Sequence, residues 1–248
     1  MEPKEVRYRQ LIADVKTSYQ MAPASACPEE RGLYWYDACQ EINLWTYWQG
    51  RGCLDAEIML VGQDWGNPWE LPIQPVLRKL DSPGTVRNYM EENKNPTDNN
   101  LAKLFLELGY DITKPCDKLF FTNFVLGYRN YKISGGFQRA WAQHDEKFFS
   151  RLVDIINPKV ILCLGKSTYR AVMLALDPGK KVRIGEYNAF ITGPNNPQAV
   201  QSEAGRNIQV FALAHCGAIG TMNRNRGSKG ARELDLQKED WRKIKPYL

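Results

Sequence analysis

The fold is decided by residues 158–176, PKVILCLGKSTYRAVMLAL. An apolar run at 159–165 ends at Gly165, and the apolar residues of 167–176 recur at helical spacing. This pattern predicts a buried strand that enters a helix through a glycine turn. Three other runs share the apolar character of 159–165: 57–62 (EIMLVG), 118–125 (KLFFTNFV) and 207–214 (NIQVFALA). We expect the four runs to be parallel strands of one buried sheet.

Helical periodicity fills the intervals between these runs. Two further segments place apolar residues at helical spacing: Leu101, Leu104, Phe105 and Leu108 in the first, and Phe148, Phe149, Leu152, Val153 and Ile156 in the second. Thr97 and Asp98 are suited to cap the first helix. The alternation predicts an α/β fold with three αβα layers around a central, mostly parallel four-stranded sheet, in one domain over residues 1–248. Residues 65–100 read as an irregular insertion with some helix near 75–80.

Composition narrows the class of protein. The 248 residues include 33 Lys+Arg and 28 Asp+Glu, a mildly basic balance that suits a polyanionic partner. Six cysteines are scattered without a C-x-x-C pair, so we expect free thiols and neither a zinc site nor a disulfide framework. No apolar run is long enough to cross a bilayer and the first ten residues are too charged for a secretory signal. We therefore expect a cytoplasmic monomer with no membrane contact.

Polar residues stand where the predicted strands end. Gln63 and Asp64 follow the first run, Asn123 lies within the second, and His215 follows the last. Each alone has an ordinary role as a turn cap, a loop anchor or a core histidine. Ligands of parallel α/β sheets collect at the carboxyl ends of the strands. The four residues together therefore predict a site that combines a carboxylate, an amide and an imidazole.

The same segments resemble the uracil-DNA glycosylase superfamily. Residues 58–64 (IMLVGQD) are similar to the family's first motif, and 121–125 (FTNFV) to the strand whose asparagine reads the base. Residues 158–165 are similar to a strand-to-helix segment of the bacterial and archaeal members, and Ala214-His215 stands where the family has His-Pro-Ser. The resemblance covers about residues 55–226 and implies the uracil-DNA glycosylase fold.

The activity that this resemblance implies is hydrolysis of the N-glycosidic bond of a flipped-out pyrimidine in DNA. Charge separates in that reaction, positive on the sugar and negative on the departing base. By resemblance, Asp64 positions the attacking water, His215 donates a hydrogen bond to the base oxygen, and Asn123 holds the base edge beside Gln63. No lysine lies in the matched motifs, so we expect a monofunctional enzyme that leaves an abasic site. The family's iron–sulfur cysteine pattern is missing, so no metal or other cofactor is expected.

The choice of base stays open at this stage. Trp65-Gly66 stand where uracil-specific members have Pro-Tyr, and the tyrosine there blocks the C5 side of the base. Gly66 leaves that side open unless Trp65 or Trp69 covers it. The substrate is then uracil or a C5-modified pyrimidine. One alternative is a phage-defence glycosylase for a bulky base such as glucosylated hydroxymethylcytosine, and another is a non-catalytic DNA-binding or sensor protein of the same fold.

Residues 216–226, CGAIGTMNRNR, follow the histidine as a Gly- and Asn-rich loop that becomes basic. The family places its wedge and minor-groove loop here. The resemblance implies that Ile219 or Met222 enters the base stack and that Arg224, Arg226 and Lys229 contact phosphates. The alternative is an ordinary solvated basic loop.

Overall fold

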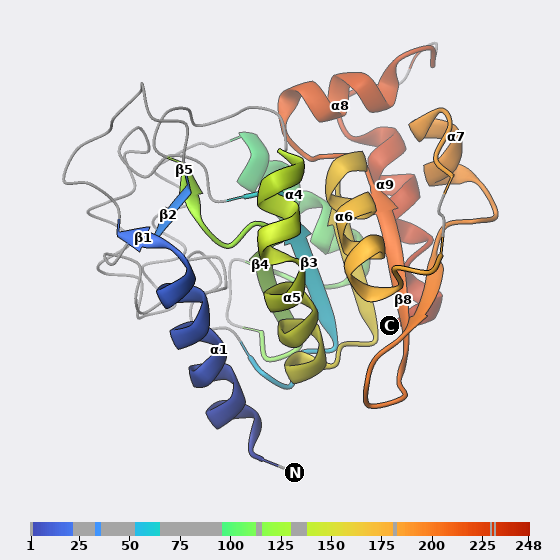
Figure 1. The fold of residues 1–248 in the computed structure, drawn as a ribbon. Helices are drawn as coiled ribbons and strands as arrows, with labels where there is room; N and C mark the ends of the chain where they lie inside the picture. The colour runs from blue at the N-terminus through green and yellow to red at the C-terminus, as the bar shows by residue number, and fades with distance from the viewer. Residues whose placement is uncertain are drawn as a thin grey trace.

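The computed structural model describes residues 2–21, 33–35, 53–64, 96–112, 116–129, 138–180, 183–228, 230 and 232–248. Its centre is a five-stranded sheet with the strand order β4-β3-β6-β8-β7 (Figure 1). The strands are β3 (Ile58–Gly62), β4 (Leu119–Asn123), β6 (Val160–Leu164), β7 (Gln198–Gln201) and β8 (Asn207–Leu213). The first three and β8 are parallel, whereas β7 pairs antiparallel with β8.

The α/β class and the four predicted parallel strands are confirmed. The sheet has five strands in total, so the prediction of a four-stranded sheet was wrong. The fifth strand, β7, has the sequence QAVQ, and Val200 is its buried residue. An edge strand packs on one neighbour only, so it needs no continuous apolar run. Its polar sequence therefore carried no strand signal.

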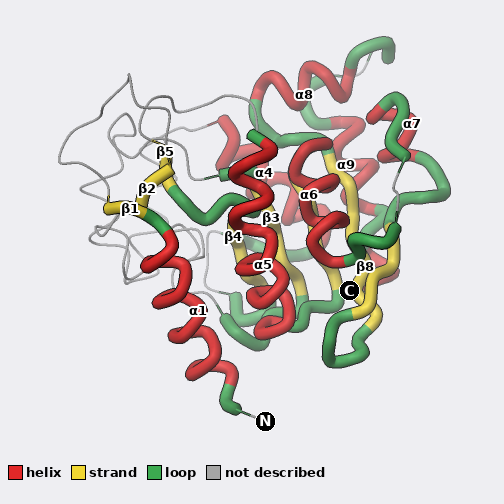
Figure 2. Tube along the Cα trace, viewed as in Figure 1, coloured by secondary structure: helices red, strands yellow, loops and turns green. Residues whose placement is uncertain are grey.

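Helices cover both faces of the sheet (Figures 1 and 2). One face carries α1 (Lys4–Ser18), α5 (Arg139–Ile156) and α6 (Lys166–Leu176), and the other carries α4 (Pro96–Leu108) and α9 (Asp235–Arg242). Consecutive residues of β4 show the two sides. Phe120 packs edge-on against Tyr8 of α1 with ring centroids 6.3 Å apart, and Phe121 lies 5.0 Å from Phe105 of α4.

Shorter elements surround these layers. They are α7 (Tyr187–Thr192), α8 (Ala218–Asn225), a 3₁₀ turn at Lys245–Tyr247, and a small sheet of β1 (Gln20–Met21), β2 (Leu33–Trp35) and β5 (Tyr128–Arg129). The predicted helices at 101–108, 148–156 and 167–176 are present as α4, α5 and α6. The helix expected near residues 75–80 lies outside the described residues. Within the described ranges, no helix combines the length and apolarity needed to cross a bilayer.

Candidate active site at the carboxyl edge of the sheet

Strand register brings Asp64 and His215 to the same level of the sheet. Val61 of β3 pairs with Cys163 of β6, which pairs with Ala212 of β8. Asp64 and His215 each lie three residues beyond this paired row. Because β6 separates the two strands, two strand spacings or roughly 9–10 Å divide the two positions. At that level β6 has already turned away into α6 at Gly165, whose φ is +99°.

Asn123 lies beside Asp64 because of a glycine. Gly62 pairs with Asn123 across β3 and β4, and a Cβ on Gly62 would overlap the Asn123 side-chain oxygen. The ladder continues past the strand ends, since Phe124 N–H donates to Gly62 O and Val125 N–H to Gln63 O, both at 3.0 Å. Residues 62–64 and 123–125 are therefore held together as one unit.

The amide of Asn123 is buried and has spare hydrogen-bonding capacity. The residue is 8% exposed, and no side-chain hydrogen bond of Asn123 is found within the described part of the chain. A primary amide offers two donor hydrogens and one acceptor oxygen, so the side chain can bind a ligand through both kinds of group. A carboxamide pairs one donor and one acceptor with the polar edge of a base.

The carboxylate of Asp64 is oriented by its neighbour. Gln63 Nε2 donates to Asp64 Oδ2 at 2.8 Å, and both residues are half-buried. An amide that bonds one carboxylate oxygen restricts the rotation of the group. The sequence-predicted pair thus acts together, with Gln63 as a support for Asp64 in addition to its expected place in base recognition.

His215 is held in one tautomer. Its Nδ1 lies 3.0 Å from the backbone N–H of Gly217, which can only donate, so Nδ1 is the acceptor. The proton of the neutral ring therefore sits on Nε2. Partial withdrawal from water lowers the pKa of His215 below its ordinary value, which favours the neutral form at pH 7. The residue is exposed, so its Nε2–H can donate to a ligand oxygen.

Comparison with known proteins leaves the site to be read from its own geometry. The sequence matches no model of a known protein family, and it matches no curated protein.

The segment after His215 is a helix, so the loop expected at 216–226 was wrong. Helix α8 begins directly after Gly217 and folds back over the histidine. A Cβ on Gly220 would overlap the carbonyl group of His215, and one on Gly217 would lie 3.0 Å from both His215 Nδ1 and Thr97 Oγ1. The glycines that suggested a loop instead allow the helix to pack closely on the catalytic candidate.

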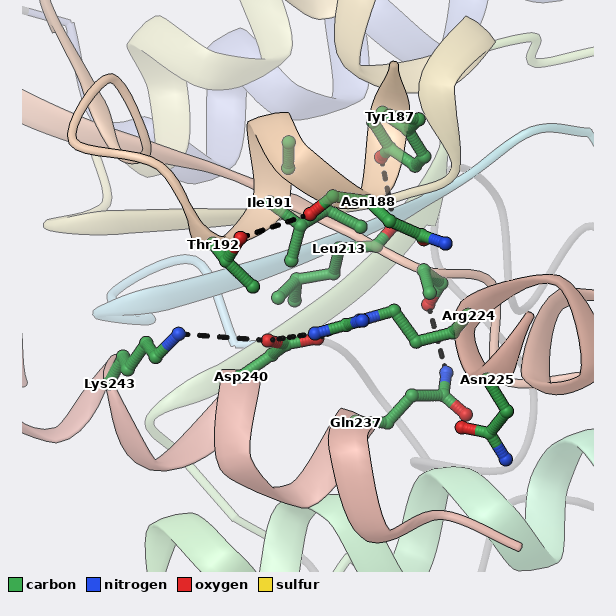
Figure 3. Close-up of polar contacts among 12 residues, drawn as sticks. Tyr187, Asn188, Ile191, Thr192, Leu213, Arg224, Asn225, Gln237, Asp240 and Lys243 are labelled. Carbon is green, nitrogen blue, oxygen red and sulfur yellow. Dashed lines mark hydrogen bonds and ion pairs between the residues drawn. The ribbon is translucent and has the colours of Figure 1, made fainter. Parts of the chain in front are cut away.

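Arg224 is not available to DNA phosphates, contrary to the prediction. Its side chain is 7% exposed, and its Nε and Nη2 bond the two carboxylate oxygens of Asp240 on α9 at 2.6 and 2.9 Å (Figure 3). Lys243 adds a weaker contact, 3.8 Å from Asp240. The arginine therefore anchors α8 to α9.

The outer face of α8 keeps the other predicted DNA contacts exposed. Ile219 and Met222 are 72% and 59% exposed, one helical turn apart, and Arg226 is exposed just beyond the helix. Lys229 lies outside the described residues, as do Trp65, Gly66 and Trp69, so the predictions for these four stay untested.

A buried carboxylate that binds the backbone at Leu126, three residues after Asn123, was missed by sequence reasoning. Asp145 of α5 is fully buried, accepts from Leu126 N–H at 2.6 Å, and bonds Tyr19 Oη and His144 Nδ1. The contact with Asp145 raises the pKa of His144 above its ordinary value. The cluster fixes the chain that follows Asn123. No local pattern could reveal it, because Tyr19 precedes Asp145 by 126 residues.

Proposed function

We propose that this chain is a monofunctional DNA glycosylase that hydrolyses the N-glycosidic bond of a flipped-out pyrimidine. The observation that carries the proposal is the buried Asn123, whose amide lies over Gly62 at the sheet edge that also carries Asp64 and His215. An amide for a base edge, a carboxylate and a neutral imidazole donor are the groups that this reaction needs.

The chemistry divides between the two sides of the bond. The negative charge of Asp64 opposes the positive charge that develops on the sugar, and its oxygens accept a proton from the attacking water. The Nε2–H of His215 donates to the pyrimidine oxygen as the base leaves with the bonding electron pair. The neutral ring can supply this hydrogen bond at pH 7, because the lowered pKa of His215 disfavours the imidazolium and Nε2 carries the proton.

Helix α8 supports DNA as the substrate. Removing a base from a duplex requires extrusion of the nucleotide, and apolar side chains that enter the stack offset the cost. Ile219 and Met222 present such side chains next to His215, on a helix anchored by Arg224 and Asp240. Arg226 adds positive charge for the backbone.

The test measures free base and abasic sites from oligonucleotides that carry uracil, a thymine mismatch, hydroxymethylcytosine or glucosylated hydroxymethylcytosine. We expect release to fall by about 10²-fold or more in Asp64→Asn and in His215→Gln. Asp117→Asn, an exposed carboxylate before β4, is the matched control and should release base at the wild-type rate. Tight DNA binding without release from any substrate would overturn the enzymatic proposal in favour of a binding protein.

The role of α8 is tested by comparing duplex with single-stranded substrate. Ile219→Ala and Met222→Ala should reduce release from the duplex by roughly 10-fold and leave the single strand nearly unaffected, since only the duplex must be opened. Leu174→Ala removes a similarly exposed apolar side chain from α6 and is the control. Equal effects on both substrates would contradict a wedge.

A further inference from the structure

Three consecutive backbone carbonyls around His215 are held by two amide side chains. Gln237 Nε2 of α9 donates to Ala214 O at 3.3 Å and to His215 O at 3.2 Å. Asn100 Nδ2 of α4 donates to Cys216 O at 2.8 Å. Side chains from two helices that are far apart in sequence therefore hydrogen-bond the short segment that links β8 to α8.

The side-chain amide of Gln237 has a defined orientation. The two carbonyl oxygens can only accept, so its Nε2 faces them, and its Oε1 accepts from the Thr221 hydroxyl at 2.8 Å. Gln237 is 1% exposed, and Figure 3 shows it beneath α8 beside Arg224. A buried amide with both ends bonded favours one arrangement strongly, because a flip would set its oxygen against the two carbonyl oxygens, all of which are acceptors.

The backbone of this segment determines the state of the imidazole. Gly217 N–H reaches His215 Nδ1 only if residues 215–217 keep their tight turn, and the two amides hold the carbonyls of that turn. Releasing a carbonyl lets the turn open and removes the donor that selects the Nε2–H tautomer.

We propose that Asn100 and Gln237 are positioning residues that keep His215 neutral and protonated on Nε2. Neither needs to contact the substrate. The proposal rests on the proposed function for the consequence of that state in base release, whereas the state of the ring itself can be measured without any activity.

The first readout is the ¹⁵N spectrum of histidine-labelled protein. The chain has two histidines, and the His215→Gln variant identifies the signals of His215. We expect wild-type Nδ1 to be unprotonated and Nε2 protonated. In Asn100→Asp and Gln237→Glu, which replace a donor by an acceptor of equal size, the two tautomers should mix. Asn99→Asp adds the same charge on the same turn as Asp98 and Asn100, and it should keep the wild-type tautomer.

The second readout is the kinetics of base release. Misplacing the donor should lower kcat by roughly 10- to 100-fold with KM nearly unchanged, since the amides act on the imidazole and not on DNA binding. If Gln237→Glu fails to fold, Asn100→Asp at its half-buried position still tests the proposal. An unchanged tautomer in Asn100→Asp would overturn it. If Asn100→Asp shifts the tautomer but the wild-type protein releases no base, only the proposed function is overturned.

Discussion

Replacing Arg224 by methionine tests whether this side chain holds the site together or contacts DNA. Methionine keeps the length and apolar stem of the side chain and removes the guanidinium. Asp240, with a side chain 3% exposed, then keeps its charge without its main partner. The remaining contact to Lys243, at 3.8 Å, comes from a half-exposed side chain and offsets little of the loss.

The expected loss follows from the burial of the pair. Removing one partner of a buried ion pair costs about 3–5 kcal/mol, because the other charge stays buried. The Lys243 contact returns at most about 1 kcal/mol. We expect Arg224→Met to lower the free energy of unfolding by about 3 kcal/mol and the melting temperature by roughly 6–12 °C.

Urea unfolding of wild type and Arg224→Met measures this loss. The double variant Arg224→Met/Asp240→Leu removes both charges and should recover a large part of it, since no unpaired charge remains. The salt dependence of DNA binding is measured at a temperature where all variants are folded. The slope of log K against log salt concentration should not change in Arg224→Met, whereas Arg226→Met should reduce its magnitude by about 1. A loss below about 1 kcal/mol together with a reduced slope in Arg224→Met would refute the anchoring role.

Three other perturbations address the site and its supports. In Gly62→Ala the new Cβ displaces the Asn123 amide, so base release should fall at least about 10-fold while binding of undamaged DNA persists; unchanged release would contradict the close approach. Burial raises the pKa of Asp98 to about 6 from 3.8, so this carboxyl lowers stability as pH rises through that interval. The free energy of unfolding of Asp98→Asn minus that of wild type, measured in urea, should therefore be larger at pH 8 than at pH 4 by on the order of 1–3 kcal/mol. The same difference at both pH values would contradict this prediction. The pKa of His144 is raised above 6.5 by Asp145, so its stabilisation is complete below pH 6.5 and is lost as pH rises through the higher value in the folded protein. His144→Gln should flatten that part of the melting-temperature profile, and a profile identical to wild type would exclude the contribution.

The parallel strands were predictable because strands buried on both faces are continuously apolar. β3 and β6 satisfy that rule, and β4 and β8 each keep an apolar run beside polar residues; the order of these strands in the chain placed Asp64 and His215 at strand ends. Asp64 and His215 lie at the same height along the sheet because of the register in which β3, β6 and β8 pair, and this register cannot be inferred from the sequence.

Tertiary contacts override local preferences in α8, which is why it was read as a loop. Gly220, Asn223 and Asn225 are weak helix formers. The helix forms because Arg224 reaches Asp240 and Thr221 reaches Gln237, both on α9 and both 16 residues further along the chain. The crossing of two helices is decided by packing, so the burial of Arg224 could not be inferred from a basic stretch.

The contact between Gly62 and Asn123 also bears on how reliably the protein folds. Side chains alternate along a strand, so a one-residue slip of β4 on β3 would set Thr122 or Phe124 against the glycine and turn the amide to the opposite face. Such a chain would keep a hydrogen-bonded sheet, yet the amide that we propose to read the base would point away from the site. The fraction of active molecules in a refolded preparation would then count the chains that aligned these two strands correctly.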